Sequence, residues 1–271
     1  MRVDRRVALA VVLVATVMQL FPLLWMVSTA AKPEAEVFGR LSLLPAQPTL
    51  DNVRYVWARV PMLRYFVNSL VVALLVAGGQ TISSIAAAYA FARFRFPGRD
   101  ALFLAAVGTM LVPFQITMIP NFLLVSRLGW INTLPGLVAP HLASAFGIFM
   151  LRQHFLAFPA SLEEAAAIEG ASRWQILWRL VVPINRAALA ALAVLFFIQS
   201  WNEYFWPLLV AKDVHATTLP LGLARFVSAE GGTLFGPLMA AATLATVPAV
   251  ALFLVVQREI VSSFTTSGLK G

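Results

Sequence analysis

Six long apolar runs constrain this sequence more than any other feature. They cover residues 7–30, 67–91, 101–126, 134–151, 187–210 and 236–257 of the 271-residue chain. A bilayer core of about 30 Å is crossed by roughly 20 apolar residues in a helix, which satisfies its own backbone hydrogen bonds where no water is present. The pattern therefore predicts an all-α integral membrane protein with six transmembrane helices, forming a single transmembrane domain over residues 1–271.

Composition agrees with a protein that lies in lipid. Hydrophobic residues make up 60% of the chain and charged residues only 12%, whereas soluble domains carry about a quarter charged residues. Cysteine is absent, so no disulfide, thiolate nucleophile or cysteine zinc site is expected. The net charge of +8 comes from basic residues at the edges of the apolar runs. They form no stripe interleaved with aromatic residues, so nucleic-acid binding is not expected.

Basic residues in the short flanking segments predict the orientation. Cytoplasmic loops of membrane proteins carry an excess of lysine and arginine. Two groups of arginines precede the first run or join the second run to the third: Arg2, Arg5 and Arg6, and Arg93, Arg95 and Arg99. With six spans, Arg152, Arg173, Arg179, Arg186, Arg258 and Lys270 then also lie inside. Both termini are therefore predicted to be cytoplasmic. The first run is longer than that of a signal peptide and no small-residue cleavage site follows it, so we expect it to be retained.

The segment between the fourth and fifth runs, residues 159–183, is typical of two short helices joined by a glycine. Ser161 followed by Glu164 matches a capping box and predicts the start of a first helix. Gly170 can end that helix in a left-handed conformation. Small side chains on this helix would let the backbone of another protein approach closely.

A second capping box, Ser172 followed by Gln175, predicts the next helix. Its apolar face includes Trp174, Leu177 and Trp178, and Pro183 is expected to stop it.

At these residues the sequence resembles the permease subunits of type I ABC importers, whose hallmark is a cytoplasmic EAA loop. The match comprises Glu164, Ala165, Ala166, Glu169, Gly170, Ala171, Leu180, Val182 and Pro183, with Glu169 where the family usually has aspartate. The resemblance implies the type I ABC importer permease fold, with EAA coupling helices that dock on an ATPase subunit. It assigns ATPase coupling to Glu163, Glu164, Ala165, Ala166, Glu169, Gly170, Ala171 and Pro183.

The resemblance extends over nearly the whole chain and is closest to the second permease subunit of carbohydrate-type importers. Supporting segments are residues 68–70, 89–98, 201–209 and 219–223, whereas residues 267–271 depart from the family's usual ending. The resemblance implies a heterodimer with a second permease subunit, a dimer of ATPase subunits and an extracytoplasmic solute-binding protein, in a bacterial or archaeal cytoplasmic membrane. ATP and magnesium would be bound by the partner ATPase, since this chain has no Walker A pattern. No cofactor or metal is expected here.

Polar residues within the apolar runs are candidates for the solute pathway, because hydrocarbon disfavours them. These are Gln115, Asn121, Gln199, Asn202, Glu203 and Tyr204. Residues 112–120 and 201–206 resemble permeases for glycerol-3-phosphate and glycerophosphodiesters, and sugar permeases share much of both segments. A phosphate would require a cation or a helix N-terminus, and no apolar run contains a cation, although Arg64, Arg127 and Lys212 flank the runs. We expect alternating-access import of a sugar or sugar-like solute, with glycerol-3-phosphate or glycerophosphodiesters as the alternative.

Two other classes of protein fit the sequence less well. A secondary transporter would need ion-coupling residues at the membrane midplane and usually has an internal repeat, and neither is found. A membrane enzyme would need clustered catalytic groups, but His141, His154 and His215 lack metal-ligand spacing.

Trp201, Tyr204 and Trp206 could stack on a sugar ring or form an interfacial aromatic belt. Prolines within the runs predict kinked helices at Pro22, Pro113, Pro120, Pro140, Pro207 and Pro248.

Overall fold

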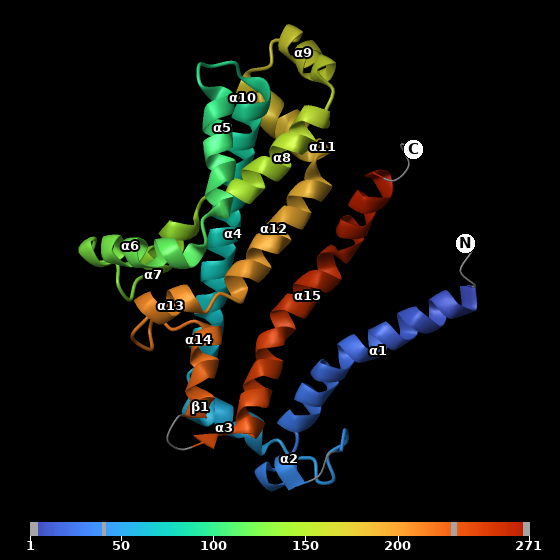
Figure 1. Cartoon of the computed structure of the whole chain (residues 1–271), viewed down its shortest axis with the longest axis vertical. Helices are drawn as coiled ribbons and strands as arrows, with labels where there is room; N and C mark the ends of the chain where they lie inside the picture. Colours follow the sequence, from blue (N-terminus) through green and yellow to red (C-terminus); the bar gives the residue numbers. More distant parts are fainter. Residues whose placement is uncertain (1–4, 40–41, 229–231, 268–271) are drawn as a thin grey trace. The chain divides into compact units, whose positions relative to one another are not determined.

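The computed structural model describes residues 5–39, 42–228 and 232–267 (Figure 1). These residues are largely helical, and the short strands β1 (Val227–Ser228) and β2 (Gly232–Thr233) pair antiparallel. The predicted basic residues Arg2 and Lys270, and most of the C-terminal segment, lie outside the described residues. The chain forms two compact units, one of residues 1–66 and 219–248 and one of residues 67–218 and 249–271.

The first unit contains the long helix α1, the first residues of two other long helices, and several short elements. They are α1 (Arg5–Ala30), α2 (Glu34–Gly39), α3 (Asp51–Arg59), the start of α4 (Met62–Arg93), α14 (Leu219–Leu223), η4 (Ala224–Phe226), both strands and the first part of α15 (Phe235–Ser267). Buried Asn52 donates hydrogen bonds to the carbonyls of Ala30 and Lys32, at 2.9 and 2.7 Å. This amide therefore ties α3 to the end of α1, since it satisfies two backbone acceptors there.

The second unit contains the remainder of α4 and the elements between it and α14. They are α5 (Arg99–Gly108), η1 (Thr109–Leu111), α6 (Phe114–Arg127), α7 (Leu134–Val138), η2 (Ala139–His141), α8 (Ala145–Ala157), α9 (Ala160–Ile168), α10 (Arg173–Ile176), the π-helical turn η3 (Leu177–Val181), α11 (Val182–Ile184), α12 (Arg186–Trp201) and α13 (Phe205–Val210). Within this unit, α9 lies beyond the ends of α5 and α8, and α13 lies toward their opposite ends (Figure 1).

A close helix contact fixes the centre of the second unit. Gly147 on α8 lies so near α4 and α12 that a Cβ atom would come within 2.3 Å of Ser84 Oγ and 2.8 Å of Phe196 Cζ. Helices in membranes approach closely where small residues face one another. Gly147 therefore allows α8 to pack between α4 and α12.

Candidate membrane spans can be counted from helix length and hydropathy. Three qualify as single helices: α1, α4 and residues 235–254 of α15. Three more are bent pairs, in which α5 with η1 meets α6 at 100°, α7 with η2 meets α8 at 47°, and residues 173–184 meet α12 at 83°. The described residues thus hold up to six spans if each bent pair counts as one. The six-span topology and the single domain remain predictions.

The prolines that were predicted to kink helices lie in different settings. Pro113 is the N-cap of α6 at the 100° bend, where its missing N–H and fixed φ suit the start of a new helix. Pro22, Pro120 and Pro248 lie inside α1, α6 and α15. The predicted fifth run is interrupted, because α12 ends at Trp201 and α13 begins at Phe205.

Candidate functional site

The predicted coupling segment begins with α9, which starts one residue earlier than its capping box. Pro159 is the N-cap, and no side chain caps the helix. Ser161 already lies inside α9, so the predicted Ser161–Glu164 capping box is wrong. The physical reason is that a proline φ near −61° is already set for entry into a helix.

Gly170 ends α9 as predicted, with φ of +89°. The Gly170 N–H donates to the Ala167 carbonyl and the Ala171 N–H donates to the Ala166 carbonyl, each at 3.0 Å. These two bonds form a Schellman motif, whose left-handed residue is usually glycine. A Cβ at Gly170 would meet nothing within 4 Å. The requirement for glycine within this chain is therefore conformational and not steric.

The capping box that starts α10 is confirmed. Ser172 Oγ accepts from the Gln175 N–H at 3.3 Å, and Gln175 Oε1 accepts from the Ser172 N–H at 2.8 Å. Ile176 and Leu177 are buried, whereas Trp174 is 66% exposed. The predicted apolar face of this helix is thus divided between the interior and the surface.

Pro183 does not stop the second helix, so that prediction is wrong. It lies in α11, which follows directly on the π-helical turn η3, and the helical stretch that begins at Arg173 continues past it to Ile184. The chain turns instead at Asn185, whose side-chain amide donates to the Val181 carbonyl at 2.8 Å. The 83° bend into α12 follows directly.

The exposed side of α9 carries small, apolar and acidic residues together. Glu164, Ala165, Glu169 and Gly170 are exposed, and Ile168 is 88% exposed. An isoleucine this open is a large apolar group without cover from its own chain. We refer to these five residues as the α9 surface. Of the other residues predicted for coupling, Ala166 and Ala171 are half-buried and Pro183 is exposed.

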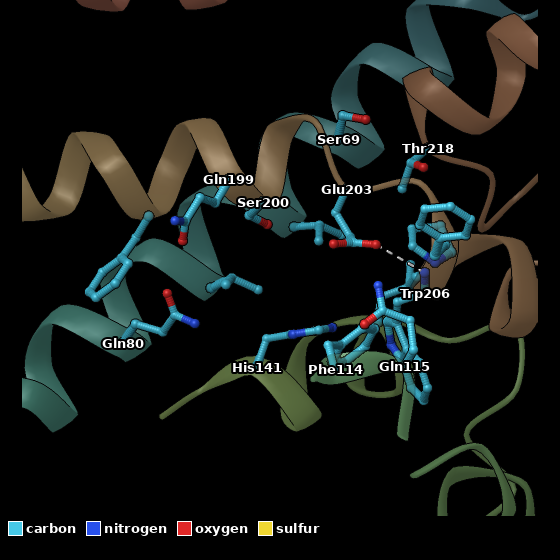
Figure 2. Close-up of a pocket in the computed structure, with 16 residues that line it drawn as sticks. Ser69, Gln80, Phe114, Gln115, His141, Gln199, Ser200, Glu203, Trp206 and Thr218 are labelled. Atoms are coloured by element: carbon cyan, nitrogen blue, oxygen red, sulfur yellow. Dashed lines mark hydrogen bonds between the residues drawn. The ribbon is translucent and has the colours of Figure 1, made fainter. Parts of the chain in front are cut away.

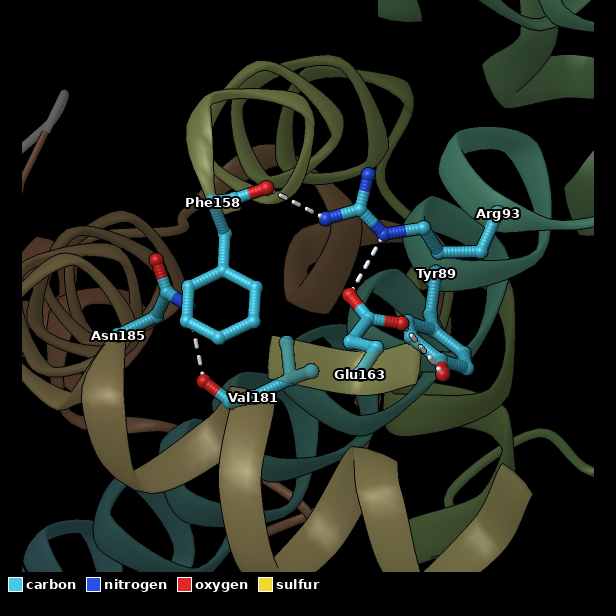
Figure 3. Close-up of polar contacts among 6 residues, drawn as sticks. All are labelled: Tyr89, Arg93, Phe158, Glu163, Val181 and Asn185. Carbon is cyan, nitrogen blue, oxygen red and sulfur yellow. Dashed lines mark hydrogen bonds and ion pairs between the residues drawn. The ribbon is translucent and has the colours of Figure 1, made fainter. Parts of the chain in front are cut away.

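Glu163 faces the opposite way from Glu164 and is only 3% exposed. Figure 3 shows its carboxylate between Arg93 and Tyr89 of α4, with Arg93 Nε at 2.6 Å and the Tyr89 hydroxyl donating at 3.1 Å. Arg93 also donates to the Phe158 carbonyl at 2.8 Å, just before α9. A charge-assisted contact of this kind is strong where solvent is excluded. These contacts fasten α9 to the end of α4.

A polar cavity of about 290 Å³ lies in the second unit, toward α13. Gln80 of α4, Gln199 and Ser200 of α12, and Gln115 of α6 contribute polar side chains, and Glu203 comes from the link between α12 and α13. Figure 2 shows these side chains around a common space, with His141 on its other side. Ser69 and Thr218 complete the polar part of the lining.

Three rings form one wall of this cavity. Phe114, His141 and Trp206 have ring centroids 5.4, 5.9 and 6.3 Å apart. The Trp206 indole donates to the Gly136 carbonyl at 2.9 Å, and its backbone N–H donates to Glu203 Oε1 at 3.1 Å. Glu203 therefore holds the start of α13 while its carboxylate borders the cavity.

The structure brings together three of the six predicted pathway residues. Gln115, Gln199 and Glu203 line the cavity, whereas Asn121, Asn202 and Tyr204 do not. The Asn202 amide instead donates to the Ile198 carbonyl at 2.9 Å.

The sequence analysis did not include Gln80 or His141 among the candidates for the solute pathway. Gln80 lies within the second apolar run, so the rule that selected the other polar residues would also have found it. No group of three histidine, aspartate or glutamate residues within the described parts of the chain could hold a metal ion.

The second unit thus combines bent apolar helices, the helix α9 fastened to α4, and a polar cavity toward α13. Comparison with known proteins gives the family. Residues 79–265 match the family model described as binding-protein-dependent transport system inner membrane component, and the chain belongs to this family, the permeases of ABC importers.

Its relatives include transport permeases for different solutes. The arabinooligosaccharides transport system permease protein of Halalkalibacterium halodurans is 31% identical over 93% of this chain and 91% of its own length. The sn-glycerol-3-phosphate transport system permease protein of Yersinia pestis is 32% identical over 94% of each chain.

The fold agrees with a solved structure. A chain of a bacterial ABC transporter involved in the import of the acidic polysaccharide alginate superposes with a TM-score of 0.82 and 24% identity, over 95% of this chain and 99% of the other. At that identity the likeness supports the fold and carries no conclusion about the solute.

Proposed function

We propose that this permease imports a sugar or sugar-like solute by alternating access, and that residues 159–183 couple its movement to a partner ATPase. The observation that carries the proposal is the α9 surface, an exposed isoleucine among small and acidic residues on a helix that Glu163 fastens to α4. The small residues beside this isoleucine would let the backbone of a partner approach closely. The absence of a Cβ at Gly170 leaves room for a partner backbone.

The partners follow from the family and from the chemistry that this chain lacks. Binding-protein-dependent transport requires a solute-binding protein. The chain has no Walker A pattern, so ATP and magnesium are held by an ATPase dimer. A second permease subunit completes the pathway. In this arrangement the α9 surface and both termini face the cytoplasm.

Sugar import is supported by the amide-rich and aromatic lining of the cavity and by the arabinooligosaccharide relative. Amide groups donate and accept hydrogen bonds, as sugar hydroxyls require. The alternative solute, glycerol-3-phosphate, is favoured by one observation, the relative from Yersinia pestis.

Cross-linking and uptake together test the coupling proposal. The chain has no cysteine, so Ala165→Cys on the α9 surface introduces a single thiol. In the assembled transporter we expect a maleimide–diazirine reagent, attached to this thiol and activated by light, to join it to the ATPase subunit. Gln47→Cys, exposed after α1 and predicted to lie outside, is the matched control and should give no such product.

Uptake into proteoliposomes should require the ATPase subunit and ATP. Equal cross-linking of both cysteine variants would contradict docking at α9. Uptake driven by an ion gradient without the ATPase would instead favour a secondary transporter.

A further inference from the structure

The charge of the cavity lining bears on whether the solute is uncharged or anionic, since the compared proteins are named for solutes of both kinds. Its lining includes three glutamines, three hydroxyl side chains, one imidazole and one glutamate. Neither lysine nor arginine is among the described residues that line it. Two of the relatives and neighbours handle anions, glycerol-3-phosphate and alginate.

Some polar atoms at this cavity have no hydrogen-bond partner in the described structure. They are His141 Nε2 and Thr218 Oγ1, both buried. Buried polar atoms are nearly always paired, and each exception calls for an explanation. A hydroxyl group both donates and accepts, so it can pair with either atom. A solute rich in hydroxyls fits these two positions and the neighbouring glutamines.

An anionic group would meet the opposite conditions. It would lose its hydration without a lysine or arginine to replace it, and such a loss is costly in a site of low dielectric constant. The nearby Glu203 carboxylate would repel it. The Trp206 N–H at the start of α13 already donates to Glu203, so that amide is not available to an anion.

We propose that the cavity binds an uncharged, hydroxyl-rich solute group such as a sugar ring or polyol, and that Glu203 makes it selective against anions. The aromatic wall of Phe114 and Trp206 suits the apolar face of such a ring, while the glutamines of α4, α6 and α12 suit its hydroxyls (Figure 2). The cavity volume of about 290 Å³ is at the lower end of ligand pockets, which span roughly 300–1,000 Å³. This inference rests on the proposed function and names the solute class of its pathway.

The first test measures the electrostatic potential of the cavity in the assembled transporter. Gln199→Cys places a single thiol of this chain there, and mass spectrometry of this chain measures its labelling. Cationic trimethylammonioethyl methanethiosulfonate should react at least about tenfold faster than anionic sulfonatoethyl methanethiosulfonate, because a cleft of one sign concentrates counter-ions. Both rates are normalised to those of the exposed control Gln153→Cys.

Adding Glu203→Gln to Gln199→Cys should remove most of this preference. An unchanged ratio in that double variant, equal rates in the single variant, or no labelling by either reagent would overturn the proposal.

The second test uses protection by solutes. Maltotriose and arabinotriose are the uncharged probes, and glycerol-3-phosphate and an alginate trisaccharide are the anionic probes. We expect at least one uncharged probe to slow labelling of Gln199→Cys by twofold or more, as on the order of half-occupancy requires, with Gln153→Cys unaffected. Protection by an anionic probe, or by none of the four, would overturn the assignment.

Labelling needs no ATP turnover, so its failure would leave the α9 cross-link and ATP-dependent uptake intact. Loss of those two results with the labelling preserved would instead count against the proposed coupling.

Discussion

Two adjacent glutamates on α9 have opposite environments. Glu163 is buried against Arg93 and Tyr89, whereas Glu164 is exposed on the α9 surface. Residues next to each other on a helix do not share a face. A glutamate therefore anchors α9 internally at position 163, whereas the glutamate at position 164 is exposed to an external partner. This pair offers a matched comparison of structure and coupling.

Replacing Glu163 with glutamine should destabilise the protein. Glu163→Gln removes the charge opposite Arg93, and hydrogen bonds to charged groups contribute about 2 kcal/mol. We expect a lower melting temperature for the purified transporter in detergent. Glu164→Gln should change the free energy of unfolding by less than about 0.5 kcal/mol, as exposed substitutions usually do, but should reduce ATP-driven uptake. Equal melting temperatures for the two variants would contradict the anchoring role of Glu163.

The turn between α9 and α10 depends on backbone conformation at one position. A left-handed φ costs a residue with a side chain roughly 1–2 kcal/mol, and asparagine tolerates it better than others. Valine is poorly suited to such a φ because its Cβ is branched. Substitutions at Gly170 can therefore separate the shape of the turn from the space beside it.

Gly170→Val should lower both stability and ATP-driven uptake, because the Schellman motif is strained. Gly170→Asn should keep the melting temperature near that of the unmodified protein and still reduce uptake, since it adds a side chain where the ATPase is proposed to approach. Thermal unfolding and uptake, measured in parallel, check both. Normal uptake with asparagine would count against docking at this turn.

Helix packing in the second unit depends on a different glycine. Gly147→Ala should destabilise the protein by about 1–3 kcal/mol, the range for overpacking, because a Cβ would overlap Ser84 and Phe196. Gly78→Ala on α4 is the control, since a Cβ there meets nothing within 4 Å. Thermal unfolding should separate the two variants, and similar midpoints would mean that α8 does not pack as closely as described.

At the scale of the whole molecule, the predicted six spans and cytoplasmic termini assign a side of the membrane to each connection. The segment after α1 is predicted to be outside and α9 inside, because four spans precede α9. Gln47 and Ala167 are both exposed, so each can report the side on which it lies.

Single cysteines should label from opposite sides of the membrane. A membrane-impermeant maleimide should reach Gln47→Cys in right-side-out vesicles and Ala167→Cys only in inverted vesicles. Detergent-solubilised transporter, in which both thiols should react, controls for accessibility. Labelling of both positions from one side would contradict either the span count or the orientation.

The sequence alone was sufficient to predict the features that depend on local periodicity and composition. Apolar runs predict membrane helices because hydrocarbon leaves the backbone no other partner. Gly170 and the Ser172–Gln175 capping box were predicted correctly because a turn and a helix cap are made by residues a few positions apart. The spacing of Glu164 to Pro183 was also sufficient to identify the permease family.

Tertiary structure decided what depends on neighbours distant in sequence. Only packing shows that Glu163 turns inward to Arg93, 70 positions earlier in the chain. Only packing joins Gln80, His141 and Gln199 around one cavity and leaves Asn121 and Tyr204 out of its lining. Local pattern gives the polarity of a residue and the helix that carries it. Which face of the helix packs against the rest of the chain depends on the other helices. Their residues are distant in sequence, so a local pattern does not reveal it.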